Sequence, residues 1–90
     1  MMVEIYSRRR CPLCDEMHKE VETMLRGLPV EYRVRYIEDS EDLFSRFRYD
    51  IPVLAVDGEV VFIHRLDREA FAELLRSRGM PIAQTPPADA

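Results

Sequence analysis

The stretch that decides the fold runs from residue 5 to residue 14 and reads IYSRRRCPLC. Together with the residues just upstream, its apolar start is typical of a short strand over residues 3–6. A loop of consecutive arginines follows. Pro12 then favours the first turn of a helix, where the N–H that proline lacks has no partner in any case. The stretch therefore predicts a strand, a basic loop and a helix that opens with two cysteines, Cys11 and Cys14.

These two cysteines are too few to hold a secreted domain together through disulfide bonds. They are separated by only two residues, so a bond between them would close a very small loop and would hardly constrain the unfolded chain. We therefore expect the pair to have a chemical role, in redox reactions or in metal binding.

The position of each cysteine predicts a different role. Cys11 lies at the helix N-terminus, where free N–H groups, the helix dipole and the arginines at 8–10 favour a thiolate. Because the thiolate is the attacking species, Cys11 is predicted to be the nucleophile. Cys14 falls on the apolar stripe of the helix, so it is predicted to be partly buried and to act as the resolving thiol. The rest of that stripe consists of Met17, Val21, Met24, Leu25 and Leu28.

The remaining chain contains clear signals for further elements. Residues 30–37 alternate between apolar and charged side chains, which predicts a half-exposed strand at a sheet edge. Ser40 is a plausible N-cap for a short helix. Residues 53–56 are continuously apolar, as expected of a central strand, and Asp57-Gly58 predicts a hairpin to a strand at 59–63. Asp67 is predicted to cap the last helix.

Two of these helices have a predicted apolar side. The first is formed by Leu43, Phe44 and Phe47, and the second by Phe71, Leu74 and Leu75. The order β-α-β-α-β-β-α predicts an α/β fold: a four-stranded mixed sheet, parallel at first and then antiparallel, with helices on both faces. One domain is expected over residues 1–79, followed by a proline-rich, disordered tail over residues 80–90.

Composition excludes several classes of protein. With 90 residues, the chain fits one domain, and its net charge of −4 argues against nucleic acid as the main partner. No apolar run reaches the roughly 18 residues of a membrane helix, and no secretory signal is visible at the N-terminus. We expect a cytoplasmic protein with neither a nucleic-acid nor a membrane partner.

Taken together, residues 5–14, the IPVL sequence at residues 51–54 and the Asp57-Gly58 hairpin resemble the small glutaredoxin-like members of the thioredoxin superfamily. The resemblance covers roughly residues 2–78. It implies a thioredoxin-like fold, a cis peptide bond before Pro52 and a substrate-binding role for the backbone of Ile51. It also places Arg8 where glutaredoxins carry a cation, three residues before the first cysteine.

The same resemblance implies further site residues. Pro12 and Leu13 lie inside the redox motif and would contact substrate, and Asp67 matches an acidic residue that helps to hold glutathione. The chain departs from the family where Leu13 replaces the usual aromatic residue and His64-Arg65 replaces a Gly-Gly step. Glutathione is thus a candidate co-substrate, and no resident cofactor or metal is expected.

Three functional hypotheses follow. The leading one is a monomeric thiol–disulfide oxidoreductase that acts on protein disulfides or on mixed disulfides with a small thiol such as glutathione, and is recycled by a separate reductant. The second is a zinc or iron–sulfur module built on Cys11, Cys14 and His18, completed by His64, Asp15 or a partner chain. The third is a non-catalytic domain that binds extended peptides in the groove at Ile51.

Overall fold

The computed structural model describes residues 1–82, in which four strands and three α-helices alternate along the chain. The elements are β1 (Met2–Ser7), α1 (Pro12–Leu25), β2 (Glu31–Tyr36), the 3₁₀ turn η1 (Ile37–Asp39), α2 (Glu41–Phe47), β3 (Val53–Val56), β4 (Glu59–Ile63) and α3 (Arg68–Ser77). This is the predicted order of strands and helices, with η1 added between β2 and α2.

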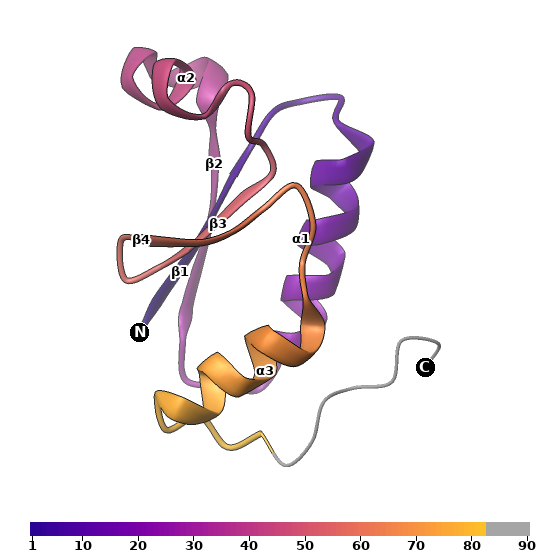
Figure 1. Ribbon diagram of the computed structural model, residues 1–90, viewed down its shortest axis with the longest axis vertical. Helices are drawn as coiled ribbons and strands as arrows, with labels where there is room; N and C mark the ends of the chain where they lie inside the picture. Colours follow the sequence, from indigo (N-terminus) through magenta and orange to yellow (C-terminus); the bar gives the residue numbers. More distant parts are fainter. Residues whose placement is uncertain (83–90) are drawn as a thin grey trace.

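The strands form one mixed sheet in the order β2-β1-β3-β4. The helix α1 connects β1 to the parallel strand β2, while β3 pairs antiparallel with both β1 and β4. In Figure 1, α1 and α3 lie to one side of the strands and α2 lies at one end of the sheet. The mixed α/β sheet expected from the sequence is confirmed, with β2 at an edge as its charged positions predicted.

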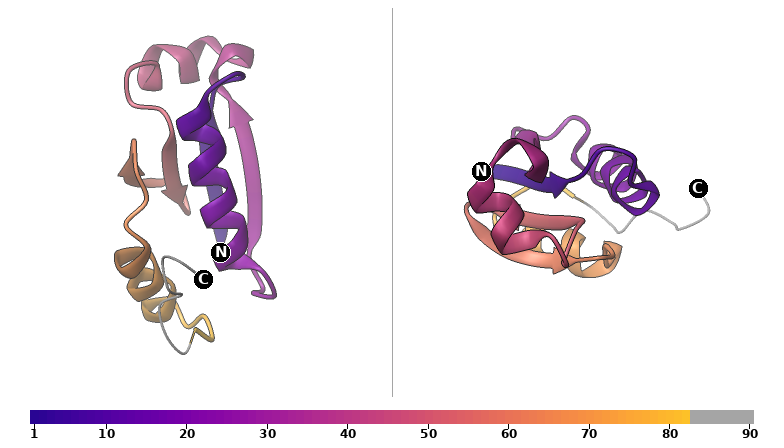
Figure 2. Two further views of the ribbon diagram at one scale, coloured as in Figure 1. Left: turned by 90° about the vertical axis from the view of Figure 1, so that its right-hand side faces the viewer. Right: turned by 90° about the horizontal axis from the view of Figure 1, so that it is seen from above.

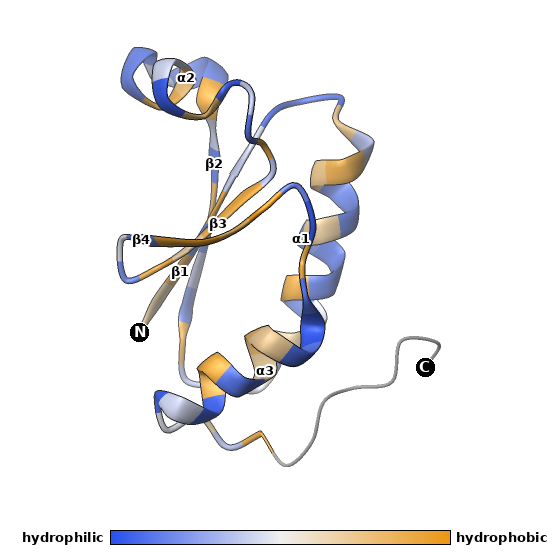
Figure 3. Cartoon of the chain, viewed as in Figure 1, coloured by the Kyte–Doolittle hydropathy of each residue, from blue (hydrophilic) through white to orange (hydrophobic). Residues whose placement is uncertain are grey.

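The main core lies between the sheet and the two longer helices. Alternate side chains of β1 and β3 point to this face, and they pack against the apolar sides of α1 and α3. Its fully buried members include Val3, Ile5, Leu54, Val56, Met17, Val21, Phe71 and Leu75. Figure 3 shows the amphipathic colouring of α1 and α3, in contrast to the hydrophobic colouring of β3. All residues of β3 are buried, as expected of a central strand.

A smaller core on the opposite face is covered by α2. Ile37, Leu43, Phe47 and Val53 are its buried members, and the rings of Tyr6 and Phe47 stack with their centroids 4.7 Å apart. Because α2 is only seven residues long, it covers one end of this face. In Figure 2 (left), α2 and the start of α1 lie at one end of the molecule and α3 lies at the other.

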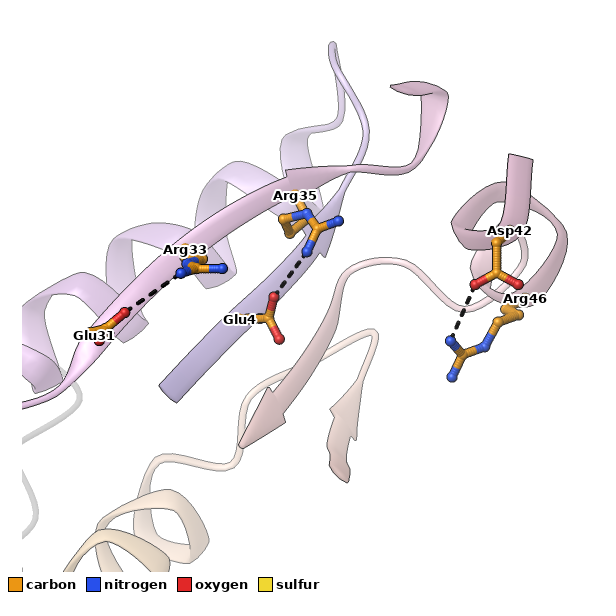
Figure 4. Close-up of polar contacts among 6 residues, drawn as sticks. All are labelled: Glu4, Glu31, Arg33, Arg35, Asp42 and Arg46. Carbon is orange, nitrogen blue, oxygen red and sulfur yellow. Dashed lines mark hydrogen bonds and ion pairs between the residues drawn. The ribbon is translucent and has the colours of Figure 1, made fainter. Parts of the chain in front are cut away.

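Ion pairs occupy the part of this face near β2. Glu4 of β1 pairs with Arg35 of the neighbouring strand at 3.2 Å, and Glu31 pairs with Arg33 along β2 at 3.7 Å (Figure 4). A third pair in Figure 4, Asp42–Arg46 at 3.5 Å, lies within α2. Charged side chains on β2, an edge strand, disfavour pairing of this edge with another chain.

Some details differ from the sequence predictions. Phe44 was expected on the buried side of α2, but it is 43% exposed because Leu43 and Phe47 make the contact with the sheet. Ile37 lies beyond the end of β2, in η1, where it is buried in the smaller core. Leu28 lies beyond the end of α1, although it still packs on the main core.

The hairpin between β3 and β4 has the predicted turn. Asp57 and Gly58 both have positive φ angles, 50° and 85°, as a tight turn joining twisted strands requires. The pairing of β3 with β4 shifts its register between Leu54 and Ala55. The sequence did not signal this shift. Beyond α3, Met80 and Ile82 pack against the main core. The rest of the expected tail, residues 83–90, lies outside the described residues.

No helix within residues 1–82 combines the length and the apolar character that a membrane span needs.

Candidate active site

Three chain segments meet at the end of the sheet where α1 begins. The register pairs Tyr6 with Val53, and Val53 with Ile63, so the segments that flank these strands lie side by side at this end. They are the arginine loop that leads into the cysteine pair, the approach to β3 and the segment after β4 (Figure 1). His64 joins the last two, since its N–H donates to the carbonyl of Pro52 at 2.8 Å.

The cysteine pair occupies the first turn of α1. Cys11 and Cys14 are joined as a disulfide, with their Cα atoms 5.2 Å apart. Both residues are buried, with exposed fractions of 7% for Cys11 and 1% for Cys14. The little exposure that the pair retains therefore lies mostly on Cys11.

The N-cap of α1 is Cys11 itself. Its backbone is extended, with φ −124° and ψ 101°, and its carbonyl accepts the first helical hydrogen bond from the N–H of Asp15 at 3.0 Å. The Cys11 Sγ takes the place of a capping oxygen and accepts the N–H of Cys14 at 3.2 Å. A backbone donor and the positive end of the helix dipole thus face this sulfur, an arrangement that stabilises negative charge on it.

The sequence between residues 2 and 76 matches the glutaredoxin-like domain family (DUF836). The chain belongs to this glutaredoxin-like family. Its fold and the placement of its cysteine pair agree with that membership, as the resemblance noted in the sequence implied.

The alignments between this glutaredoxin-like chain and its relatives cover most of its length. It is 28% identical over 79 residues to a thioredoxin from Methanocaldococcus jannaschii, with 84% of this chain and 93% of that protein covered. A structural-genomics target protein from X. campestris, XcR50, has the same fold with a TM-score of 0.68 at 22% identity, covering 83% and 96% of the two chains. A mutant form of the thioredoxin-like protein BC3987 aligns with a TM-score of 0.56 at 26% identity, covering 81% and 97%.

The segment that leads into β3 carries the second predicted motif, the IPVL sequence at residues 51–54, and brings it to the site. The Ile51–Pro52 peptide bond is cis, Pro52 is buried, and Ile51 is half-buried against the smaller core. No hydrogen bond within residues 1–82 uses the backbone N–H or C=O of Ile51. Both groups are therefore free to pair with an incoming extended chain.

A pocket of about 290 Å³ opens beside the cysteine pair, on the side of Leu13. Leu13 is 51% exposed and forms one wall with Glu16 and Glu20, while His64 and Arg65 form the other.

Two further predicted site residues lie outside this pocket. Asp67, predicted to bind substrate, does not line it. Its carboxylate caps α3 by accepting the N–H of Ala70 at 3.0 Å. Pro12 is exposed at the first position of α1.

The arginine loop is attached to η1 by its middle residue. The Arg9 guanidinium donates to both Asp39 carboxylate oxygens at 3.1 Å, and its backbone N–H donates to Glu38 at 3.0 Å. Its guanidinium carbon lies 4.3 Å from the ring centroid of Tyr36. The hydrogen bond from Arg9 lowers the pKa of the Asp39 carboxyl below its ordinary 3.8. Arg9 is thus a paired cation, and Arg8 and Arg10 on either side are exposed.

His18 connects α1 to β2. Its Nδ1 lies 2.7 Å from the hydroxyl of Tyr32, and its Nε2 lies 3.7 Å from Glu22. Burial raises the pKa of Tyr32 well above its ordinary 10.0, and the nearby Glu22 adds to the shift. The sequence placed His18 off the apolar stripe but did not reveal this bond. Among residues 1–82, no three His, Cys, Asp or Glu side chains are grouped so as to hold a metal ion.

The contacts that sequence reasoning missed share one feature. Arg9 and Asp39 are 30 residues apart in the chain, and His18 and Tyr32 are 14 apart. Neither pair forms a spacing motif. One partial signal was present for the arginine loop, because an aspartate and a glutamate precede the N-cap of α2, at the end of the strand parallel to β1.

Proposed function

We propose that this chain is a thiol–disulfide oxidoreductase in which Cys11 is the nucleophile and Cys14 the resolving thiol. The observation that carries the proposal is the asymmetry of the pair: the Cys11 Sγ caps the helix and accepts the N–H of Cys14, whereas Cys14 is almost completely buried. A sulfur that receives a backbone N–H and the helix dipole is stabilised as a thiolate, which is the species that attacks a disulfide.

The proposed reaction has two exchange steps. The Cys11 thiolate attacks one sulfur of the partner's disulfide, forms a mixed disulfide and releases the other partner sulfur as a thiol. Cys14 then loses its proton to solvent and attacks the Cys11 sulfur, which releases the second partner thiol and leaves the Cys11–Cys14 disulfide. Two electrons pass from the protein to the partner, and a separate reductant restores the dithiol.

The remaining predicted site residues are assigned to substrate contact in this proposal. The unused N–H and C=O of Ile51, next to Pro52, support pairing with an extended peptide or with the backbone of a glutathione-type thiol. Leu13 offers an exposed apolar contact beside the pair. Pro12 and Asp67 are assigned substrate contact by family resemblance alone. Arg8 supplies positive charge near Cys11. The proposal further includes a monomeric state, a cytoplasmic location and no resident metal.

The proposal is tested by equilibrating the purified protein in a series of glutathione redox buffers and reading the thiol state of the pair by mass. We expect one reversible two-electron transition. A pair that stays reduced, or stays oxidised, across the whole series would contradict the proposal.

Two matched variants separate the roles of the two sulfurs. Cys14→Ser should retain the first step and accumulate a one-to-one mixed disulfide with the small thiol, visible as a mass increase. Cys11→Ser, which changes the same atom type, should accumulate little or none because Cys14 is 1% exposed. Equal trapping by the two variants would show that the roles are not divided as proposed.

A further inference from the structure

The two edges of the sheet differ in how well they are protected against pairing with another chain. β2 carries charged side chains at Glu31, Arg33 and Arg35, of the kind that disfavour such pairing. β4, the opposite edge, reads EVVFI and has one charged residue, at its start, with no lysine or proline. In Figure 2 (left), β4 is the leftmost strand of the sheet. Its outer side has no neighbouring strand within residues 1–82, so the backbone groups on that side are open to a partner.

Two apolar side chains of β4 are exposed on the same face of the sheet. Val60 is 43% exposed and Ile63 is 46% exposed. They lie opposite Ala55 and Val53 of β3, and residues directly opposite each other in an antiparallel pair point to one face. Val53 belongs to the smaller core, so Val60 and Ile63 lie on the face that α2 covers in part. We call this face the α2 face.

The register shift in β4 is what places both side chains on the α2 face. In a regular strand, residues three positions apart point to opposite faces. The shift leaves Val61 without a partner on β3, and Val61 and Phe62 both pack against the main core. Along β4, the side chains therefore point to the α2 face at Val60, to the main core at the next two residues and to the α2 face again at Ile63.

This order is the same when β4 is read in either direction, so it matches a second copy of itself. When two β4 strands pair antiparallel about a two-fold axis, one register places Val60 opposite Ile63 of the second copy and Val61 opposite Phe62. Every facing pair then has both side chains on one face, as an antiparallel ladder requires. A shift of one or two residues in either direction would oppose side chains that point to different faces.

The charges at the two ends of β4 are also self-complementary. Glu59 begins the strand, and His64 and Arg65 follow its end. Neither Glu59 nor Arg65 has an ion-pair partner within residues 1–82. In an antiparallel pair, the start of one strand lies beside the end of the other. Each Glu59 therefore comes near the basic residues of the second copy, and the two-fold axis repeats this contact.

We propose that β4 pairs with β4 of a second copy of this chain in this register and joins the two four-stranded sheets into one. The pairing uses both β4 edges and leaves the charged β2 edges outermost, so association ends at a dimer. Stable interfaces bury roughly 1,200–2,000 Å² in total, and this ladder is short, so we expect a dissociation constant on the order of 0.1–1 mM. Dilute protein therefore stays the monomer of the proposed function, whose chemistry does not require the pairing.

The first test measures association of the oxidised protein, in which the Cys11–Cys14 disulfide leaves no thiol to link two chains. Sedimentation equilibrium, over concentrations from well below to well above the expected dissociation constant, gives the mass. Amide shifts in NMR spectra over the same series locate the contact. We expect the mass to rise from one chain toward two, with shifts confined to β4 and its turn. A mass of one chain throughout, or shifts confined to β2, would refute the pairing.

The same substitution on each edge strand shows which edge is used. Val60→Lys should weaken association about tenfold, since a lysine on an edge strand opposes pairing. Val34→Lys is the matched control, because Val34 is 37% exposed on β2, and it should leave association unchanged. Urea unfolding checks that both variants are folded. Equal weakening by the two variants would show that the β4 edge is not the contact.

A charge exchange tests the register without altering the apolar residues. Glu59→Arg should weaken association about fivefold, because it brings arginine beside Arg65 of the second copy. Adding Arg65→Glu in the same chain should restore the affinity, since acid and base have exchanged places. Adding Arg26→Glu instead gives the same net charge but changes an exposed residue at the C-terminal end of α1, so association should stay weak. Equal recovery in both double variants would overturn the register.

One further outcome concerns the occupant of the edge. If the chain stays monomeric while an unrelated valine-rich peptide shifts the amides of β4, the edge accepts strands of other proteins and pairing with a second copy is refuted. None of these results affects the redox titration of the cysteine pair, so the proposed function and this inference can fail separately.

Discussion

At the end of the sheet where β1 begins, Arg78 is paired with Asp57 at 3.0 Å, and Asp57 also accepts the N–H of Met2 at 2.8 Å. At the other end, Arg8 and Arg10 lie beside the cysteine pair with no acid partner in residues 1–82. Paired arginines satisfy their charge within the fold and join segments distant in sequence. The unpaired arginines leave an excess of positive charge beside the cysteine pair. We infer that one end of the molecule serves stability and the other serves chemistry.

The largest expected effect on stability compares the two cores, the main core and the smaller core at the cysteine end. Phe71→Ala should lower the free energy of unfolding by about 4 kcal/mol, because Phe71 is fully buried in the main core and contacts Phe62 edge to face. The same change at Phe47, in the smaller core at the cysteine end, should cost about 3 kcal/mol, since that site is partly open to solvent. Urea unfolding followed by circular dichroism measures both. A greater loss at Phe47 would show that the cysteine end carries more of the stability than we infer.

A smaller effect is expected from the paired end. Asp57→Ala should cost about 1–2 kcal/mol, since it removes the contacts to Met2 and Arg78 and places alanine at a positive φ of 50°. The exchange rate of the cysteine pair should not change. Glu73→Ala, which removes an exposed pair with Arg76, is the control and should have little effect on stability. A slower exchange reaction in Asp57→Ala would mean that the two ends are coupled.

The contact between His18 of α1 and Tyr32 of β2 predicts a change in stability at high pH. Because burial raises the pKa of Tyr32, the folded protein binds this proton more tightly than the unfolded chain does. The resulting stability is fully present below the ordinary pKa of 10.0 and is lost as pH rises from 10.0 toward the folded value. Tyr32→Phe should remove this alkaline loss, measured by urea unfolding at pH 9 and at pH 11. Equal losses in the variant and the wild-type protein would contradict the assignment.

The smallest effect is expected at Asp39. Its pKa is lowered by Arg9, so its contribution to stability is present above 3.8 and is lost as pH falls through the folded value. Asp39→Asn should lower the urea midpoint slightly at pH 7, and the midpoints of variant and wild type should converge under acid conditions. The pair is exposed, and exposed ion pairs contribute little. A large loss at pH 7 would show that the arginine loop supports the fold as well as the site.

Most of the fold was predictable because its signals are local. The caps at Ser40 and Asp67 and the Asp57-Gly58 turn depend on contacts within a few residues, and the structure has all three. Phe44 was assigned wrongly because helical periodicity allows a wider apolar face than a helix of seven residues buries. The bulge after Leu54 left no sequence signal, since it depends on how β3 and β4 are paired.

The order of the elements, the position of the cysteine pair at a helix N-terminus and the burial of Cys14 could all be predicted from the amino-acid sequence. These follow from residue preferences and side-chain periodicity along one element. Three features became visible only in the folded chain: the pairing of Arg9 within the arginine loop, the contact between His18 and Tyr32, and the lining of the pocket beside Cys14. Such contacts join residues from different elements, and a pairing of that kind is created by the packing of the sheet rather than by any spacing in the chain.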